Sequence, residues 1–426
     1  MRITYITAGA GGFYCGACSH DVTLARGLRA RGIDVQLIPL YTPLKLDRPE
    51  PPGTTQTFFG GVSVYLEQYV PLFRHAPRLL NRLLAARPVL ELASRFGITT
   101  KPEDLGPLTV SVLLGKHGRQ ARELADLLDF LAVVPAPDVV SITNSLLSGI
   151  APALKARLGL PIVCTLQGED SFIQAIPEPH GPRANDLMRS NARSIDLFVS
   201  PSETYAARMA KFLDVPADRI RVVRTGIDTA CFPTAPARPR TPFTVGYLSR
   251  IVREKGLDTL VEALRILVNE HKRDAHLYVA GQVAERAFWS SVRAAVGRAG
   301  LSTRFHYCGG PDLAGKLAFL HRCNVFAYPG RTPEPDAVAV LEAMATGLPV
   351  VAPRAGAFPE MLALTAGVLV APNEPADLAD ALAALMDDPD LANRLGAAGR
   401  AAIRKHYSSD TMAEEMASIY SAFKKG

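Results

Sequence analysis

Two cations in the middle of the chain have the types and spacing needed to hold a phosphorylated ligand. Arg250 follows an apolar run, 244–248, that reads as a strand, and Lys255 comes five residues later, just before a predicted helix. Ligands of open parallel sheets bind beyond the carboxyl ends of the strands. An arginine that grips two oxygens at once and a lysine that acts as a point charge suit a diphosphate. A surface ion pair with Glu254 is the alternative, and it accounts for only one of the two cations.

Two glutamates eight positions apart follow a second apolar run, 325–328. Glu342 is predicted early in a helix, where its carboxylate could accept hydrogen bonds from vicinal hydroxyls such as those of a ribose. Glu334, in the preceding loop, would face whatever lies beyond the phosphates. Paired glutamates at this spacing are common as solvated charges. Because Arg250 and Lys255 stand at the end of another strand, we favour one site that contains all four residues.

The elements that must position these residues alternate along almost the whole chain. Short apolar runs alternate with longer amphipathic stretches, which predicts an α/β fold with parallel sheets and helices on both faces. The alternation stops at 232–243, where proline recurs every two or three residues and indicates a connector. We therefore predict two doubly wound domains, 1–235 and 236–405. A last helical segment, 406–426, is expected to pack back on the first domain.

One segment, at about 73–130, breaks this alternation and reads as mostly helical. Its residues Arg74, Arg78 and Arg82 recur at a spacing of four and share one helix face. A solvated basic face is the favoured interpretation, and a surface that meets an anionic membrane or a charged acceptor is the alternative.

Composition limits the classes of function. The 426 residues carry a net charge of +6, and no run of about 18 apolar residues occurs that would predict a membrane-spanning helix. The amino terminus lacks the continuous apolar run of a secretory signal, and six cysteines in a chain of this length are no disulfide framework, so we expect a cytoplasmic protein. Nucleic acid is not expected as a partner, because no motif of a nucleic-acid-binding domain is present.

A glycine-rich turn follows the first predicted strand. Gly11 and Gly12 could present backbone N–H groups to an anion, or they could form a tight turn without a ligand. A nicotinamide-dinucleotide fingerprint fails, because Tyr14 occupies the position of its third glycine. Cys15 and Cys18 form a single Cys-x-x-Cys, for which a structural role is favoured over redox control, and redox control over a metal site.

Several motifs taken together resemble the retaining glycosyltransferases of family 4, which have the GT-B fold, and the resemblance extends from residue 1 to about residue 420. The motifs that carry it are Gly246-Tyr-Leu-Ser-Arg250 with Lys255-Gly, Val279-Ala-Gly281, Glu334-x7-Glu342-Ala-Met-Ala-x-Gly-x-Pro-Val, Ser200-Pro-Ser-Glu, Gly226-Ile-Asp228 and Gly367-Val-Leu-Val-Ala-Pro. The resemblance implies that a sugar moves from a nucleoside-diphosphate sugar to an acceptor hydroxyl, with retention at the anomeric carbon and with no metal or other cofactor. It implies a carbohydrate or lipid-linked acceptor. Peripheral contact with the inner face of the membrane is not part of the resemblance and follows only from the membrane interpretation of the Arg-rich insertion.

The resemblance also assigns roles to residues. Arg250 and Lys255 match the cations that stabilise the leaving diphosphate, Glu342 matches the glutamate that holds the ribose, and Glu334 matches the one near the donor sugar. These roles make Arg250, Lys255 and Glu334 the expected catalytic residues. Further expected contacts with the donor come from Gly11, Gly12, Asp336, Ala337 and Val338.

Two positions depart from the family pattern. Pro335 and Asp336 replace the Gly-Phe that usually follows the first glutamate, which removes a backbone donor and adds a carboxylate near the sugar. Gln167 stands where many relatives have histidine, and with Asp170 it is the expected contact for the acceptor or the sugar. A degenerate nucleotide-sugar-binding protein and a sugar epimerase of the same fold are the alternative functions.

Overall fold

The computed structural model describes residues 1–8, 16–41, 102–234 and 241–424. These residues form two units, which are described separately. Unit 1 comprises Met1–Arg224 and Met412–Gly426, and unit 2 comprises Thr225–Thr411.

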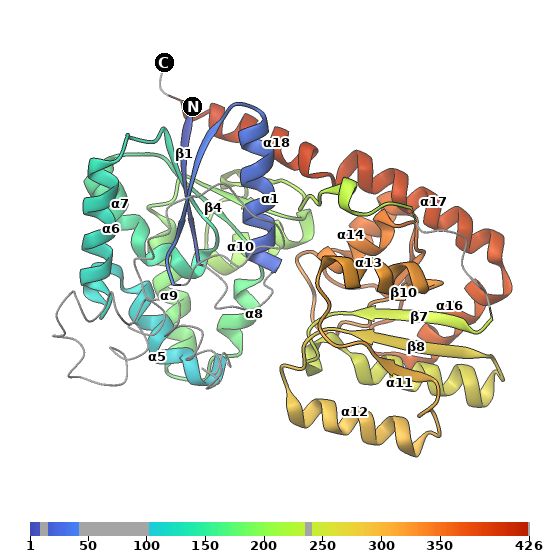
Figure 1. The fold of residues 1–426 in the computed structure, drawn as a ribbon. Helices are drawn as coiled ribbons and strands as arrows, with labels where there is room; N and C mark the ends of the chain where they lie inside the picture. The colour runs from blue at the N-terminus through green and yellow to red at the C-terminus, as the bar shows by residue number, and fades with distance from the viewer. Residues whose placement is uncertain (9–15, 42–101, 235–240, 425–426) are drawn as a thin grey trace. The chain divides into compact units, whose positions relative to one another are not determined.

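Unit 1 is built on a parallel sheet of six strands in the order β2-β1-β3-β4-β5-β6 (Figure 1). The strands are β1 (Arg2–Thr7), β2 (Asp34–Pro39), β3 (Val139–Ile142), β4 (Ile162–Thr165), β5 (Leu197–Ser200) and β6 (Ile220–Val222). Successive side chains of β1 enter different cores: Ile3 and Tyr5 pack on one face of the sheet, and Ile6 packs on the other. Both faces are therefore buried, as predicted for a parallel sheet with helices on each side.

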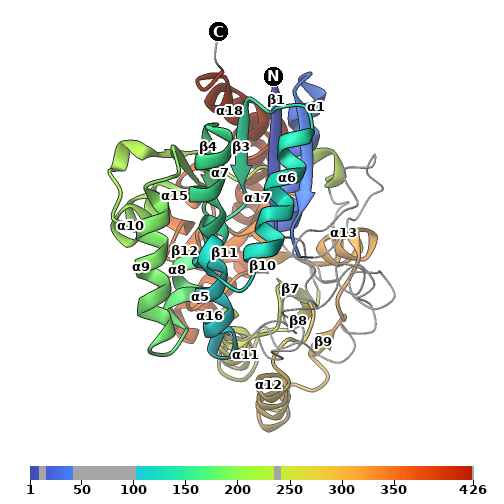
Figure 2. The same ribbon diagram turned by 90° about the vertical axis from the view of Figure 1, so that its left-hand side faces the viewer.

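The helices of unit 1 divide between these two faces (Figure 2). One face is covered by α1 (Gly16–Ala30) and by α18 (Ser409–Ser421), and Tyr420 of α18 donates a hydrogen bond to Ser141 Oγ of β3 at 3.0 Å. The other face is covered by α6 (Ala121–Val133), α7 (Ala151–Leu158), α9 (His180–Ala192) and α10 (Glu203–Leu213). Two more helices, α5 (Pro102–Leu113) and α8 (Glu169–Gln174), pack against α9.

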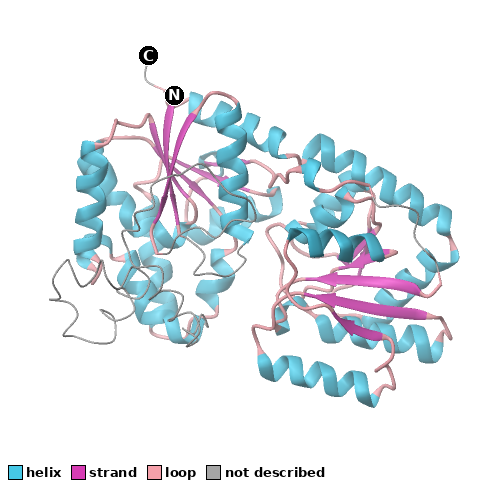
Figure 3. Cartoon of the chain, viewed as in Figure 1, coloured by secondary structure: helices cyan, strands magenta, loops and turns pink. Residues whose placement is uncertain are grey.

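Unit 2 has a second parallel sheet of six strands, in the order β12-β11-β10-β7-β8-β9 (Figure 3). The strands are β7 (Phe243–Leu248), β8 (Ala275–Ala280), β9 (Phe305–Tyr307), β10 (Val325–Ala327), β11 (Val350–Pro353) and β12 (Val368–Val370). One face packs on α11 (Leu257–Arg265), α12 (Arg286–Arg298) and α16 (Pro375–Asp387). The other face packs on α13 (Leu313–Arg322), α14 (Val338–Ala345), α15 (Phe358–Thr365) and α17 (Pro389–His406).

The chain passes into unit 2 at Thr225, seven residues before the proline-rich stretch 232–243 that the sequence suggested as the boundary. Ile227 and Phe232 are buried in a core cluster of unit 2, and the Ile227 N–H donates to the carbonyl oxygen of Tyr407 at 2.9 Å. These contacts hold 225–234 against the second sheet. Of the segment predicted as a helical insertion, 102–130 is described and contains α5 and most of α6, while 73–101 with Arg74, Arg78 and Arg82 lies outside the described residues.

Candidate active site

The turn after β7 is held in place by close backbone contacts at two glycines. Gly281, with φ +137°, follows β8, and a Cβ there would lie 1.8 Å from the carbonyl oxygen of Ser249. Gly256, with φ +71°, would bring a Cβ to 1.9 Å from the Pro329 oxygen after β10. Only glycine tolerates such approaches. Arg250 and Lys255 are thus fixed at the carboxyl edge of the second sheet, where ligands of such sheets bind.

Lys255 and Glu334, which sequence analysis assigned to one site, do meet. Lys255 Nζ donates to Glu334 Oε1 at 2.6 Å, and the two side chains are 18% and 14% exposed. Lys255 also lies over the ring of Tyr328, 5.7 Å from its centroid. Arg250, in contrast, is exposed, and no ion pair to it is found among the described residues. The Arg250 guanidinium is therefore open to solvent, whereas the Lys255 ammonium is largely buried against Glu334.

Glu342 forms a second buried ion pair, with a lysine that sequence analysis did not single out. Lys316 of α13 donates from Nζ to Glu342 Oε1 of α14 at 2.6 Å, and the side chains are 14% and 9% exposed. A carboxylate has about four lone-pair positions, so this bond does not exhaust Glu342 as an acceptor.

The loop between β10 and α14 carries the other expected donor contacts. Thr225 Oγ1 donates to Asp336 Oδ2, so the unusual carboxylate of this loop is tied to the start of unit 2. Ala337 precedes α14 as its N-cap residue and is buried, and Val338 is the first residue of the helix. The loop and the first turn of α14 are thereby brought to the same edge of the sheet as Lys255.

Two buried phenols lie near the Glu334 carboxylate. Burial raises the pKa of Tyr328 well above its ordinary value, and the negative charge of Glu334 raises it further. Burial also raises the pKa of Tyr247, with smaller contributions from the charges of Asp258 and Glu334. Both phenols are consequently neutral at every working pH, so neither can act there as a general base.

In unit 1 the turn after β4 is organised by a buried carboxylate network around Glu169. Glu169 accepts hydrogen bonds from the backbone N–H groups of Ser145 at 2.8 Å and Gln167 at 2.7 Å, and from the Tyr205 hydroxyl at 3.0 Å. Burial raises the pKa of Glu169, and these hydrogen bonds oppose the rise. The network fixes the backbone of Gln167, whose side chain donates to Thr143 Oγ1 at 3.4 Å.

Asp170, the other residue assigned to the acceptor or sugar, is only 1% exposed at its side chain and forms an ion pair with Arg208 of α10. It also accepts from the Tyr205 hydroxyl at 3.1 Å. With its oxygens engaged in this way, Asp170 is placed to hold the turn that carries Gln167.

A second buried carboxylate, Asp21 of α1, was missed by sequence reasoning. Asp21 is fully buried and accepts hydrogen bonds from Tyr5 at 3.0 Å, Thr7 at 2.8 Å and Thr143 at 2.6 Å. The ring Nδ1 of His20 lies 3.3 Å from Asp21 Oδ1, the oxygen that also accepts from Tyr5. Because Thr7 ends β1 and Thr143 directly follows β3, Asp21 joins α1 to the carboxyl edge of the first sheet. An aspartate within an otherwise apolar helix face was the signal.

Other assignments cannot be placed. Gly11, Gly12 and Cys15 lie outside the described residues, as does the side chain of Cys18. Within the described ranges, no three His, Cys, Asp or Glu side chains gather where they could hold a metal ion. None of the helices there combines the length and apolar character needed to traverse a bilayer.

Comparison with family models and curated proteins identifies relatives of both units. Residues 232–402 match the model described as glycosyl transferases group 1, and residues 92–231 match the model of glycosyltransferase family 4. Glycogen synthase of Mycobacterium tuberculosis is 30% identical over 294 residues, which cover 68% of this chain and 70% of that protein. A GDP-mannose-dependent alpha-(1-6)-phosphatidylinositol monomannoside mannosyltransferase of the same organism is 30% identical over 252 residues, 55% and 64% of the two chains.

Solved structures show the same fold. HepE of Anabaena, in complex with UDP, superposes with a TM-score of 0.67 at 18% identity, over 99% of this chain and 100% of that one. Sucrose-phosphate synthase of Thermosynechococcus elongatus gives a TM-score of 0.71 at 17% identity, over 99% and 98%. The predicted α/β architecture of two doubly wound, GT-B domains is confirmed.

Proposed function

The chain belongs to glycosyltransferase family 4, and we propose that it transfers a hexose from a nucleoside-diphosphate sugar to an acceptor hydroxyl, with retention and without a metal ion. The observation that carries the proposal is the Lys255–Glu334 ion pair at the carboxyl edge of the second sheet, on the same turn as the exposed Arg250. Relatives support the choice of donor: the HepE structures contain UDP and UDP-glucose, and a curated relative is named as GDP-mannose-dependent.

Each of these residues has a role that follows from its chemistry. Arg250 offers a planar fork of N–H donors to two phosphate oxygens, and Lys255 supplies a compact charge close to the bond that breaks. As the sugar departs, negative charge grows on the diphosphate, and cations fixed beforehand stabilise that charge. Glu334 keeps Lys255 in position and lies near the sugar, and Glu342 accepts hydrogen bonds from the ribose hydroxyls.

Retention follows, in this proposal, from attack on the face that the diphosphate leaves. The departing phosphate accepts the proton of the acceptor hydroxyl, so no separate protein base is needed. The neutral state of Tyr247 and Tyr328 is in keeping with this scheme. In unit 1, Gln167 offers an amide to a hydroxyl of the acceptor or the sugar, on a turn stabilised by Glu169 and Asp170.

The test is turnover of nucleoside-diphosphate sugars by Lys255→Ala and Glu342→Ala variants. Loss of one preorganised charge contact lowers such rates by about 100-fold or more, so we expect kcat/KM for Lys255→Ala to fall at least that far. Arg253→Ala is the matched control, since it removes a charge from the same turn but its guanidinium lies over the ring of Phe288. Turnover that is unchanged in both active-site variants would contradict the proposal.

The Asp336–Thr225 contact favours one other candidate, a protein that binds the donor without transferring its sugar. This loop departs from the family pattern at Pro335 and Asp336, next to the expected sugar position. Thermal unfolding with a series of nucleoside-diphosphate sugars separates the two functions. Saturating donor at 100 times its Kd stabilises either protein by about 2.7 kcal/mol, but only the enzyme slowly hydrolyses or transfers the sugar.

We propose a cytoplasmic site of action and peripheral contact with anionic membrane through the Arg-rich segment 73–130. Support comes from the sequence, in which Arg74, Arg78 and Arg82 share one predicted helix face. Sedimentation with vesicles of phosphatidylcholine and phosphatidylglycerol tests it. Binding should require the anionic lipid and should weaken when the three arginines become glutamine.

A further inference from the structure

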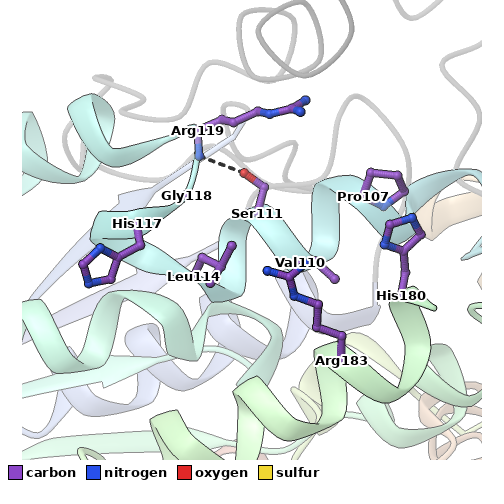
Figure 4. Close-up of a pocket in the computed structure, with 9 residues that line it drawn as sticks. All are labelled: Pro107, Val110, Ser111, Leu114, His117, Gly118, Arg119, His180 and Arg183. Atoms are coloured by element: carbon purple, nitrogen blue, oxygen red, sulfur yellow. Dashed lines mark hydrogen bonds between the residues drawn. The ribbon is translucent and has the colours of Figure 1, made fainter. Parts of the chain in front are cut away.

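Unit 1 has two polar regions to which the proposed function gives no task. The first is a cavity of about 260 Å³ between α5 and α9 (Figure 4). Its basic side chains point in different directions, and the backbone N–H of Arg119 already donates to Ser111 Oγ at 2.9 Å, so these groups do not converge on one ligand position. The second region is a chain of hydrogen bonds that runs from Asp21 through Thr143 to Gln167 at the carboxyl edge of the first sheet. This chain does lead to a defined position.

The Asp21 carboxylate fixes the direction of the first hydrogen bond in this chain. An ionised carboxylate can only accept hydrogen bonds. Thr143 Oγ1 lies 2.6 Å from Asp21 Oδ2, so the single hydroxyl hydrogen of Thr143 is used in this bond. Thr7 donates to the same oxygen at 2.8 Å and Tyr5 to the other at 3.0 Å, and burial raises the pKa of Tyr5 well above its ordinary value, so the phenol keeps its hydrogen. Asp21 is therefore surrounded by hydroxyl donors, of which Thr143 is one.

The direction of the second hydrogen bond follows from the first. Because its own hydrogen points to Asp21, Thr143 Oγ1 can only accept from the Gln167 amide, whose Nε2 lies 3.4 Å away. In the opposite orientation of the amide, Gln167 Oε1 would face Thr143 Oγ1 with no hydrogen between the two oxygens. The two ends of a side-chain amide have nearly the same shape, so the hydrogen-bond network decides its orientation. Here it turns Nε2 toward Thr143 and Oε1 away from it.

The amide oxygen of Gln167 is left for a ligand. The backbone of Gln167 is held in place, because its N–H donates to Glu169 Oε2 at 2.7 Å, and its side chain is only partly buried. Within the described residues Gln167 Oε1 accepts no hydrogen bond, and it is not one of the buried polar atoms that lack a partner. Oε1 is therefore available to a hydrogen-bond donor, and Nε2 retains a second N–H.

These two free positions of the Gln167 amide define the chemistry of the ligand. A phosphate or carboxylate group can only accept hydrogen bonds, so Oε1 would repel it. A hydroxyl both donates and accepts. One hydroxyl of a sugar ring can donate to Oε1 while its neighbour accepts from the second N–H of Nε2, which satisfies both positions.

We propose that Asp21 and Thr143 are positioning residues that orient the Gln167 amide, and that Gln167 Oε1 receives a hydroxyl hydrogen from a sugar ring of the acceptor. The second half of the statement rests on the proposed function, because only a transferase has an acceptor. Asp21 does not touch the ligand and acts through Thr143. Unit 1 thereby selects a neutral, polyhydroxylated acceptor at this position.

The test is binding of the methyl glycosides of α-D-glucose, α-D-mannose and α-D-galactose to the full chain, measured by saturation-transfer NMR. Thr143→Val keeps the shape of the side chain and frees the amide, so it should weaken the tightest glycoside about three- to tenfold, as Gln167→Met should. Thr143→Ser keeps the hydroxyl and should bind as the wild type does. Thr4→Val is the matched control and should also bind normally, because Thr4 is a fully buried threonine of β1 whose hydroxyl has no hydrogen-bond partner in the described part of the chain.

A double variant distinguishes positioning from a general loss of structure. If Thr143→Val acts through Gln167, it should weaken glycoside binding no further in a chain that already carries Gln167→Met. Full additivity, wild-type binding by Thr143→Val, or a wild-type chain that binds none of the three glycosides contradicts the proposal. Neutron diffraction from crystals grown in heavy water gives a second readout. It should show the Gln167 Nε2 deuterium atoms on the side of Thr143, and Oε1 in their place would overturn the proposed orientation.

Donor turnover separates this proposal from the proposed function. Lys255→Ala should lose turnover of UDP-glucose and should still bind the glycoside. If the wild type neither binds nor consumes a donor while glycoside binding depends on Thr143, the transferase function fails and the role of Thr143 stands. If donor turnover is observed while Thr143→Val binds the glycoside as the wild type does, the role of Thr143 fails and the transferase function stands.

Discussion

The ion pair between Lys316 and Glu342 gives a sharp prediction, because one substitution leaves a carboxylate without its partner. At 2.6 Å, with an effective dielectric constant of 20, the two charges attract each other by about 6 kcal/mol. Desolvation of both ions offsets much of this attraction in the intact pair. Replacing Lys316 by methionine removes the attraction and leaves the desolvation of Glu342, and such losses amount to about 3–5 kcal/mol.

We expect the lower end of that range for Lys316→Met, about 3 kcal/mol, because the two side chains retain 14% and 9% exposure. For a unit of this size, 1 kcal/mol lowers Tm by about 2–4 °C, so Tm of unit 2 should fall by about 6–12 °C. Lys405→Met is the matched control, since Lys405 is exposed and forms no ion pair among the described residues. Its free energy of unfolding should change by less than about 0.5 kcal/mol.

Guanidinium unfolding at pH 7, followed by tryptophan fluorescence and circular dichroism, measures these differences. The double variant Lys316→Met/Glu342→Gln should recover most of the lost stability, because it removes the unpaired charge. Calorimetric titration with UDP-glucose then shows whether Lys316 also positions Glu342 for the ribose, in which case Lys316→Met binds about tenfold more weakly. The reasoning is refuted if Lys316→Met loses less than about 1 kcal/mol, or if the double variant is less stable than the single one.

Three further substitutions test other features. Asp21→Asn should lower the free energy of unfolding of unit 1 by about 2–3 kcal/mol, measured by chemical denaturation, because an amide nitrogen cannot accept hydrogen bonds from the hydroxyls that surround Asp21. A variant as stable as the wild type would show that this network contributes little. Gly256→Ala should reduce stability and donor affinity together, since its Cβ meets the Pro329 oxygen at 1.9 Å, whereas Gly297→Ala, where a Cβ has open space, should reduce neither. Burial raises the pKa of Glu169, so its contribution to the free energy of unfolding is fully present below the ordinary pKa of about 4.5 and declines as pH rises through the raised value. The free energy of unfolding of the wild type minus that of Glu169→Gln should therefore fall between pH 4 and pH 8, and it should stay constant if the carboxyl titrates normally.

The alternation of strands and helices was enough to predict the fold, and the reason is visible in β7. The run 244–248 was read as a strand and Phe243–Leu248 is one, because every side chain in it is buried and parallel sheets covered on both faces require such runs. The entry into unit 2 was harder to place. Ile227 and Phe232 lie in a segment with little regular structure, so their burial in the second core left no periodic signal.

Long-range pairs set the limit of prediction for the site. Their positions after two predicted strands, together with the resemblance to the family, assigned Lys255 and Glu334 to one site, and the structure joins them with a hydrogen bond across 79 positions of sequence. Lys316 and Asp21 escaped notice because each is an ordinary charged residue in the sequence, and only tertiary packing shows that their partners are buried. For Asp21, the apolar residues on the same helix face were a sequence signal for burial, but they do not identify its hydrogen-bond partners.

The two ion pairs change how donor binding in unit 2 should be understood. Lys255 is matched by Glu334, and Lys316 is matched by Glu342, so these four groups together carry no net charge. In the proposed reaction, attraction of the anionic diphosphate then depends chiefly on Arg250, an exposed cation of the same turn for which the described residues supply no ion pair. Lys255 can gain a phosphate oxygen only while it shares its hydrogens with Glu334. In the proposed reaction that sharing would favour catalysis, because the phosphate becomes more negative as the sugar leaves, so that Lys255 would interact more strongly with the transition state than with the bound donor.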